Sequence, residues 1–158
     1  MSARREWLKN GFGVAARLTL AVTFIWASWH KIANPYDFGL QVATYQILPL
    51  GLVNLQAIVL PWVEVVTGLL LAAGLFTRPA ALVSCGMNAM FIVAIAIALS
   101  NDLHLQCGCF ASSAAGEEMT VELIYRDIGL LLLGAALVGL RPDRLTVDRL
   151  LERRKAHA

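Results

Sequence analysis

Charged residues are scarce in this chain. Asp, Glu, Lys and Arg make up 15% of its 158 residues, whereas a typical soluble domain carries about 25%. The net charge of +2 and the lack of a basic stripe interleaved with aromatic residues argue against a nucleic-acid-binding protein. Hydrophobic residues, in contrast, make up 58% of the chain, and the mean hydropathy is +0.66. Long uncharged runs separated by short polar breaks predict membrane-spanning helices.

Cysteine and the common catalytic motifs are also rare or missing. Three cysteines cannot form a disulfide framework, because an odd count leaves at least one thiol unpaired. The sequence contains no Gly-rich phosphate loop, no nucleophile-elbow motif and no pair of catalytic carboxylates. It therefore gives no support to a nucleotide-binding enzyme or to a hydrolase of the familiar classes.

Four apolar runs organise the chain, each close to the roughly 20 residues that a bilayer helix needs. The sequence predicts an all-α membrane protein, a single domain of residues 1–158 built as a four-transmembrane-helix bundle. We expect an interfacial segment between the first two spans, a tight turn at Thr77-Arg78-Pro79, and an amphipathic cytoplasmic helix in the tail, residues 141–158. The expected spans are residues 11–32, 55–76, 79–100 and 121–140.

Lys and Arg are distributed unevenly about these spans. With four spans, both termini share one side of the membrane, and ten basic residues fall on that side. Only Lys31 and Arg126 fall at the opposite side. This asymmetry predicts a multi-pass protein of the bacterial inner (plasma) membrane, with both termini cytoplasmic and the loop of residues 100–120 periplasmic. The ten basic residues are Arg4, Arg5, Lys9, Arg78, Arg141, Arg144, Arg149, Arg153, Arg154 and Lys155.

The periplasmic loop contains the motif Cys107-Gly108-Cys109. Disulfides persist outside the cytoplasm, and two thiols separated by one residue can close only a small, easily reduced ring. Such a ring would stabilise the fold very little, because the stabilisation by a disulfide grows with loop length. We therefore predict a redox-active pair that exchanges electrons with a thioredoxin-like protein or a membrane electron carrier.

Two other interpretations of this motif stay open. Each cysteine could bond elsewhere or be inactive. Alternatively, His104, Cys107 and Cys109 offer an imidazole and two thiolates to a soft metal. A mononuclear zinc site would need a fourth ligand, and none is found nearby, so the main prediction includes no metal.

Ionisable residues in the expected spans gather at the periplasmic level. His30 and Lys31 end the first span, Glu64 lies in the outer half of the second, and Arg126 is near the start of the fourth. Charges in hydrocarbon are costly and mark paired groups or a working cavity. We therefore predict a polar pocket beneath the cysteine loop, with Glu64 paired to either Arg126 or Lys31. The alternative is that the charges only lie at the interface or hold the bundle together.

Other polar residues in the spans have simpler explanations. For Glu122 and Asp127, an interfacial position is as good an explanation as a role in the pocket. Arg17 lies near the cytoplasmic face, where we expect it to extend to the lipid headgroups. Cys85 belongs to the stripe Ala81, Cys85, Ala89 and is expected to pack against a neighbouring helix.

Several sequence pieces, taken in order, resemble a known family. They are His30-Lys31-Ile32, Asn34-Pro35, Phe38, Tyr45, Leu48-Pro49, Leu60-Pro61-Trp62, Glu64, Gly68, Cys107-Gly108-Cys109-Phe110 and Arg126-Asp127. On these pieces the chain resembles the methylamine-utilisation proteins of the MauE type, in the DoxX-like group of four-helix membrane proteins. Ala111 departs from the family pattern, in which a glycine is expected after the phenylalanine.

The resemblance implies a four-helix bundle that works in periplasmic thiol–disulfide chemistry. It implies a thioredoxin-fold periplasmic partner and a role in maturing periplasmic proteins. It also implies coupling to a quinone, although no motif in the sequence identifies a quinone site. The lipid bilayer is the other expected partner, and nucleic acid is not expected.

Together these observations predict an inner-membrane thiol–disulfide redox protein. The cysteine pair would cycle between dithiol and disulfide, a nearby lysine or arginine would lower the pKa of the thiols, and a histidine or carboxylate would move protons. The predicted catalytic residues are Cys107, Cys109, His30, Lys31, Glu64 and Arg126. The alternatives are a non-catalytic subunit that anchors or assembles a periplasmic redox complex, and a soft-metal carrier that uses His104 with the two cysteines.

Overall fold

The computed structural model describes residues 2–44, 49–100 and 121–139, and all of its regular elements are helices. The predicted all-helical architecture is confirmed for this part of the chain. The predicted cytoplasmic helix of residues 141–158 and the cysteine loop lie outside the described residues. The helices are α1 (Ser2–Ala33), α2 (Pro35–Thr44), α3 (Leu50–Ala73), α4 (Thr77–Ser100) and α5 (Val121–Gly139).

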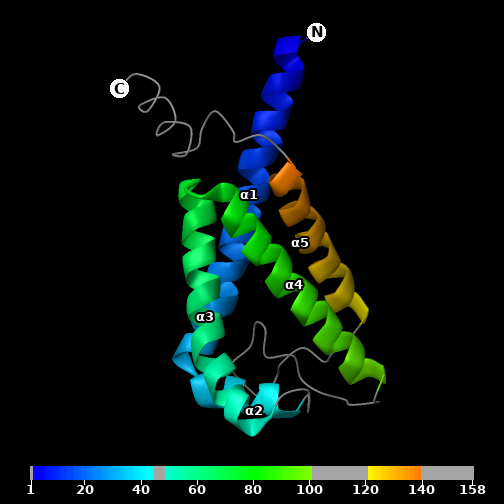
Figure 1. Ribbon diagram of the computed structural model, residues 1–158. Helices are drawn as coiled ribbons and strands as arrows, with labels where there is room; N and C mark the ends of the chain where they lie inside the picture. Colours follow the sequence, from blue (N-terminus) through cyan, green and yellow to red (C-terminus); the bar gives the residue numbers. More distant parts are fainter. Residues whose placement is uncertain (1, 45–48, 101–120, 140–158) are drawn as a thin grey trace.

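The long helices form two packed pairs, α1 with α3 and α4 with α5 (Figure 1). The short helix α2 lies across one end of the bundle and packs mainly on α3. We call this the Lys31 end, because α1 finishes there. The opposite end, where α3 turns into α4, is called the Arg78 end. The ends of α4 and α5 that flank the undescribed residues 101–120 lie at the Lys31 end.

Three described helices are long and apolar enough to cross a membrane: residues Asn10–Ala33 of α1, Gly51–Ala73 of α3 and Thr77–Ile97 of α4. These apolar helices fit a multi-pass membrane protein. Helix α5 is present, but it carries Glu122, Arg126 and Asp127 in its first two turns. A fourth span along α5 therefore stays a prediction.

Proline and asparagine separate α1 from α2. The backbone N–H of Asn34 still donates to the His30 carbonyl at 3.1 Å, which is the last bond of α1, and the Asn34 carbonyl accepts from Phe38 N–H at 3.2 Å. Pro35 begins α2, because a first helical residue needs no N–H donor and the ring already has the helical φ angle. Two consecutive helices thus meet at one residue, and α2 can change direction there.

The α3–α4 turn occupies residues 74–76, earlier than the expected Thr77-Arg78-Pro79. Gly74 ends α3 with a left-handed backbone, φ 67°, and the Leu75 N–H donates to the Leu70 carbonyl at 3.0 Å. Glycine adopts this conformation without a steric cost, so it ends helices efficiently. Pro79 does not interrupt α4, because it lies in the first turn, where a proline removes no helical hydrogen bond. The turn prediction was wrong because Gly74 ends α3 earlier, and Thr77, Arg78 and Pro79 form the first turn of α4.

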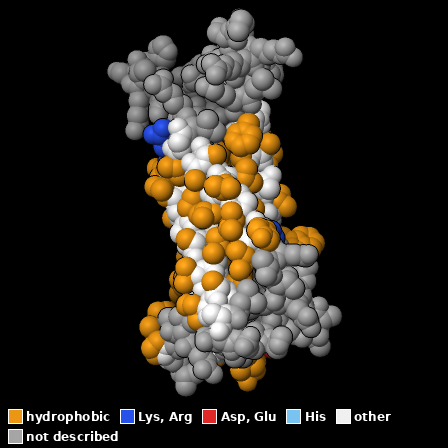
Figure 2. All heavy atoms as spheres, turned by 90° about the vertical axis from the view of Figure 1, so that its right-hand side faces the viewer, with side chains coloured by type: hydrophobic (Ala, Val, Ile, Leu, Met, Phe, Trp, Pro, Cys, Tyr) orange, Lys and Arg blue, Asp and Glu red, His pale blue; other side chains and the backbone are white. Residues whose placement is uncertain are grey.

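The packing is apolar inside the bundle and apolar on its outer surface. The buried core includes Leu20, Leu71 and Ile95, all at 0% exposure. Outward-facing side chains such as Val22 and Leu132 are more than 60% exposed, and hydrophobic side chains extend across the middle of the face in Figure 2. An apolar outer surface suits contact with lipid, whereas a soluble protein would place polar residues there.

Small residues allow neighbouring helices to approach closely. A Cβ atom built on Gly68 of α3 would lie 2.9 Å from Ile25 Cγ1 and 3.2 Å from the Ala21 carbonyl of α1. A Cβ atom on Gly134 of α5 would lie 2.7 Å from Cys85 Sγ of α4. Glycine at these two positions thus permits the close contacts within each helix pair that are typical of membrane bundles.

Candidate functional site

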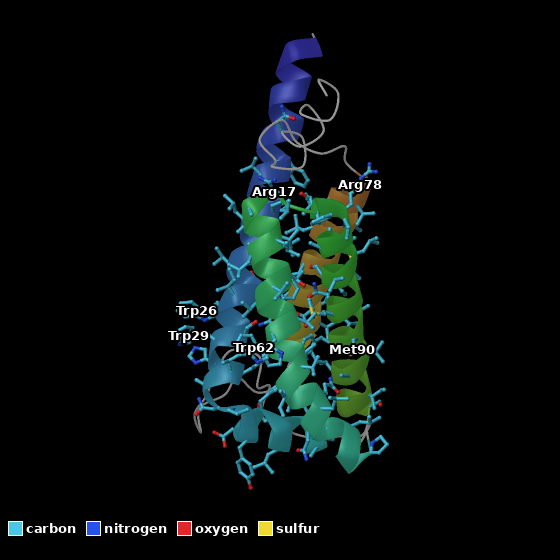
Figure 3. The ribbon with its side chains drawn as sticks, turned by 60° about the vertical axis from the view of Figure 1, so that its left-hand side comes forward. Arg17, Trp26, Trp29, Trp62, Arg78 and Met90 are labelled. Atoms are coloured by element: carbon cyan, nitrogen blue, oxygen red, sulfur yellow. The ribbon has the colours of Figure 1, made fainter. Side chains whose placement is uncertain are left out.

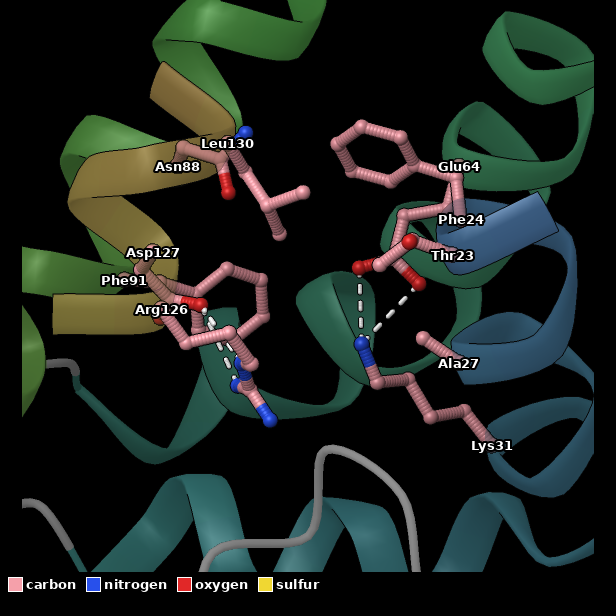
Figure 4. Close-up of a pocket in the computed structure, with 10 residues that line it drawn as sticks. All are labelled: Thr23, Phe24, Ala27, Lys31, Glu64, Asn88, Phe91, Arg126, Asp127 and Leu130. Carbon is pink, nitrogen blue, oxygen red and sulfur yellow. Dashed lines mark hydrogen bonds and ion pairs between the residues drawn. The ribbon is translucent and has the colours of Figure 1, made fainter. Parts of the chain in front are cut away.

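A small cavity lies inside the bundle towards the Lys31 end, between α1, α3, α4 and α5. The cavity is partly open, and its internal volume is about 30 Å³, enough for about two water molecules and too small for an organic ring. Apolar side chains and four charged groups share its walls (Figure 4). The lining residues are Thr23, Phe24, Ala27, Lys31, Glu64, Asn88, Phe91, Arg126, Asp127 and Leu130.

A buried ion pair forms one wall of the cavity. Lys31 Nζ of α1 lies 2.7 Å from Glu64 Oε1 and 2.9 Å from Glu64 Oε2 of α3, and the two side chains are only 2% and 1% exposed. The Ser28 hydroxyl lies 3.1 Å from Glu64 Oε2 and 2.5 Å from the Phe24 carbonyl, and it can donate to either oxygen. Of the two partners expected for Glu64, the structure selects Lys31.

Two phenyl rings complete the surroundings of the Lys31 ammonium. Its nitrogen lies 5.1 Å from the ring centre of Phe38 on α2 and 4.8 Å from that of Phe91 on α4. A cation at this distance is attracted by the negative charge of the ring face. Lys31 therefore connects its own helix to α3 through the ion pair and to α2 and α4 through the two rings.

A second ion pair lies across the cavity on α5. Arg126 Nε and Nη2 each lie 3.1 Å from Asp127 Oδ1. The arginine side chain is 31% exposed, whereas the aspartate is 5% exposed. Figure 4 shows this pair facing the Lys31–Glu64 pair across the cavity. The described lining therefore holds two positive and two negative groups, and its formal charge is balanced.

The predicted site residues do not all meet in this cavity. Lys31, Glu64 and Arg126 do line it. His30 is not among the lining residues, and its ring makes an edge-on contact with Trp26, with 6.1 Å between the ring centres. Cys107 and Cys109 lie outside the described residues, and so does His104. Within the described part of the chain, no group of three or more His, Cys, Asp or Glu residues is arranged to hold a metal ion.

Sequence reasoning missed the neutral members of the cavity wall. Asn88 is a lone amide in the apolar run of α4, and its side chain donates to the Ser84 carbonyl at 3.0 Å. Its isolation among apolar residues was an available signal. Phe91 gave no such signal, because an aromatic residue in a membrane helix is usually explained by packing.

The structure revises the expectation for Arg17 and refines that for Cys85. Arg17 was expected to extend to the headgroups, but its side chain is buried in the bundle with 4% exposure. Cys85 packs between α4 and α5 as expected, with its Sγ atom 3.8 Å from the Leu131 carbonyl. The packed face includes Ala81, which is buried, but Ala89 of the expected stripe is exposed.

Comparison with known proteins agrees with the helical architecture. The family model described as methylamine utilisation protein MauE matches residues 9–140. A protein named methylamine utilization protein MauE from Paracoccus denitrificans is 28% identical over 124 residues, which are 78% of this chain. The match spans 66% of that relative's length, slightly less than two thirds. No solved structure matches the chain. Because the family model covers most of its length, including all four helices that line the cavity, the chain belongs to the MauE family of membrane proteins.

Proposed function

We propose that this protein is a membrane-embedded thiol–disulfide redox protein whose reactive pair is Cys107 and Cys109. In the proposed reaction, the pair exchanges with the disulfide or dithiol of a thioredoxin-fold protein in the periplasm. Two electrons and two protons pass from the dithiol that is oxidised to the disulfide that is reduced. A mixed disulfide between one cysteine of the pair and one of the partner is the intermediate.

The observation that carries the proposal is the position of the cavity relative to the cysteine segment. Residues 101–120 connect Ser100, the end of α4, to Val121, the start of α5. Both of these residues lie at the Lys31 end. Arg126 is five residues into α5 and lines the cavity, so the chain leads from the cavity wall into the cysteine segment within about two helical turns.

The cavity contains the two kinds of charged group that thiol–disulfide exchange uses: a positive side chain and carboxylates that accept protons. A positive side chain near a thiol favours the thiolate, which is the reactive form. Arg126 is the better candidate for this role, because its side chain is 31% exposed, whereas the Lys31 ammonium is enclosed by Glu64 and two phenyl rings. Asp127 and Glu64 are the groups in the cavity that can take up protons released during oxidation.

If the protein transfers electrons to a quinone, we propose that the quinone binds outside this cavity. A cavity of about 30 Å³ holds water molecules but no quinone ring. A quinone that receives electrons from the cysteine pair would therefore have to bind elsewhere on the protein.

The biological setting is proposed from the relative's name. The matched protein of Paracoccus denitrificans is named for methylamine utilization. We propose that this chain supports the same process by helping a periplasmic protein acquire its disulfides. Inner-membrane location, with the termini in the cytoplasm and the cysteine segment in the periplasm, is part of this proposal and is supported by the uneven distribution of Lys and Arg.

A second candidate function is a non-catalytic subunit that anchors or assembles a periplasmic redox complex. The observation in its favour is that each charge in the cavity already has a partner of opposite sign within about 3 Å. In a non-catalytic subunit, the Lys31–Glu64 pair would act only to hold α1 and α3 together. In that case the cysteine pair has a local structural role.

Trapping a mixed disulfide separates the two candidates. With Cys107→Ser or Cys109→Ser, the remaining thiol cannot resolve the intermediate, so a covalent complex with a thioredoxin-fold protein should accumulate and disappear on reduction. Cys85→Ser is the matched control, because this thiol packs between α4 and α5 and should not change the yield. Full biological function in the Cys107→Ser, Cys109→Ser double variant would exclude the redox role and favour the anchoring role.

A further inference from the structure

The guanidinium of Arg17 is buried at the opposite end of the bundle, and no described residue supplies a matching anion. The side chain is 4% exposed, and its Nε and Nη1 atoms have no hydrogen-bond partner among the described residues. An arginine cannot escape this situation by losing its proton, because the guanidinium stays charged in proteins. A buried charge without partners is among the most costly features of a folded protein. Arg17 therefore needs an anionic group that accepts hydrogen bonds from Nε and Nη1.

The protein itself offers no such group in the part that is described. Its acidic side chains with described positions are Asp37, Glu64 and Asp127. Glu64 and Asp127 line the cavity near Lys31, and Asp37 lies in α2, which packs at the Lys31 end. Arg17 lies fourteen residues before Lys31 on the same helix, about 20 Å along the axis. None of the described carboxylates is therefore at the level of Arg17.

The height of Arg17 in the membrane suits a phosphate group. Arg17 lies seven residues after Asn10, where the membrane-spanning part of α1 begins, which is about 10 Å along the helix axis. Side chains of a helix point back towards its N-terminus, so the buried guanidinium lies nearer to the Arg78 end of the bundle than its own backbone does. Figure 3 places Arg17 near the level of Arg78, the exposed residue at the start of α4.

We propose that Arg17 forms a binding site for a phosphate group at the Arg78 end of the bundle. The planar guanidinium can donate two parallel hydrogen bonds to a phosphate, and this geometry makes arginine the preferred residue for such groups. The phosphate is carried either by an anionic phospholipid headgroup or by a free phosphate ion. The site is separate from the charged cavity, and it is independent of the proposed redox function.

The test measures thermal unfolding of the purified full-length protein in a detergent without phosphate groups. Phosphatidylglycerol, phosphatidylcholine or inorganic phosphate is added in separate samples. Phosphatidylglycerol should raise the unfolding temperature of the wild-type protein by about 3–6 °C at saturating concentration. Arg17→Met should show less than a third of this rise. It should nevertheless fold, because methionine removes an unpaired buried charge while keeping most of the side-chain volume.

Two controls decide between a specific site and general attraction by positive charge. Arg78→Gln removes an equal charge from an exposed position at the same end and should keep most of the rise. Arg17→Lys keeps the positive charge but lacks the planar guanidinium, and it should show part of the rise in unfolding temperature. The proposal is overturned if phosphatidylglycerol has the same effect on the wild type and Arg17→Met, or if Arg78→Gln loses the rise as fully as Arg17→Met.

The three additives identify the source of the phosphate. A rise with phosphatidylglycerol but not with inorganic phosphate supports a lipid headgroup. An equal rise with inorganic phosphate supports a site for the free ion. A rise with phosphatidylcholine that matches phosphatidylglycerol and persists in Arg17→Met shows that the acyl chains stabilise the protein, and it overturns the assignment to Arg17.

Discussion

Lys31 of α1 and Glu64 of α3 are joined at two points inside the apolar bundle, with 2.7 Å and 2.9 Å between the ammonium nitrogen and the carboxylate oxygens. Both side chains are almost completely removed from solvent. Bulk solvent does not reach either charge, so each depends strongly on the other. This dependence makes the pair sensitive to the loss of one member and tolerant of the loss of both.

Replacement of Glu64 by glutamine should destabilise the protein strongly. The new amide would be a neutral partner, and the Lys31 ammonium would stay buried without a counter-charge. We expect a loss of about 3–5 kcal/mol in the free energy of unfolding, measured by titration with a denaturing detergent. The double variant Lys31→Met, Glu64→Leu removes both charges and should recover most of this loss. Equal stability of Glu64→Gln and wild type would show that the ion pair does not hold the bundle together.

Replacement of Arg126 by glutamine should affect both stability and reactivity. Arg126 is 31% exposed but its partner Asp127 is only 5% exposed, so removing the arginine leaves a buried carboxylate without its counter-charge and should cost about 1–3 kcal/mol. If Arg126 favours the thiolate in the cysteine segment, alkylation of Cys107 in a Cys109→Ser background should become about threefold slower at neutral pH. Arg78→Gln is the matched control at the opposite end of the bundle. An unchanged alkylation rate in Arg126→Gln would remove this residue from the proposed mechanism.

Addition of one methyl group at Gly134 should disturb the α4–α5 contact. The new Cβ atom would lie 2.7 Å from Cys85 Sγ, so Gly134→Ala should cost about 1–3 kcal/mol. Gly129→Ala on the same helix is the control, because a Cβ atom there meets nothing within 4 Å. Combining Gly134→Ala with Cys85→Ala should relieve most of the cost. Additive losses in the double variant would show that the sulfur contact is not the cause.

A fluorescent reporter that folds only in the cytoplasm can test the fourth span and the orientation together. Fused after Ala158, the reporter should fluoresce if α5 crosses the membrane and the termini are cytoplasmic. Fused after Ser100, at the end of α4, it should be dark. Fluorescence in the second fusion but not in the first would reverse the predicted orientation. Equal results from the two fusions would show that α5 does not cross the membrane.

The sequence was most informative about the charges that lie within apolar runs. Glu64 is the only charged residue of α3, and Lys31 is the only lysine or arginine of α1 after Arg17. Hydropathy and spacing were therefore sufficient to place them at one level and to expect an ion pair. The choice between Lys31 and Arg126 as the partner could not be made in this way, because it depends on the rotation of each helix about its axis. Tertiary packing fixes that rotation.

Arg17 shows where such reasoning failed. A charge near the end of a span can reach the headgroups or turn inward, and both arrangements fit the same position in the sequence. Arg17 turns inward because it shares a helix face with Leu20, Ala21 and Phe24, all of which are buried. The periodicity of that face was present in the sequence, but the rule that long basic side chains extend to the surface was given more weight.

The three-residue turn between α3 and α4 also has a consequence for biosynthesis. So short a connection cannot cross the hydrocarbon layer, which is about 30 Å thick. Helix α4 must therefore begin on the side of the membrane where α3 ends. We therefore expect the two helices to enter the bilayer as one hairpin, with Gly74 and Phe76 at its tip. A flexible insert at this tip would allow α3 and α4 to insert separately. The yield of correctly inserted protein would then show how far insertion depends on the short turn.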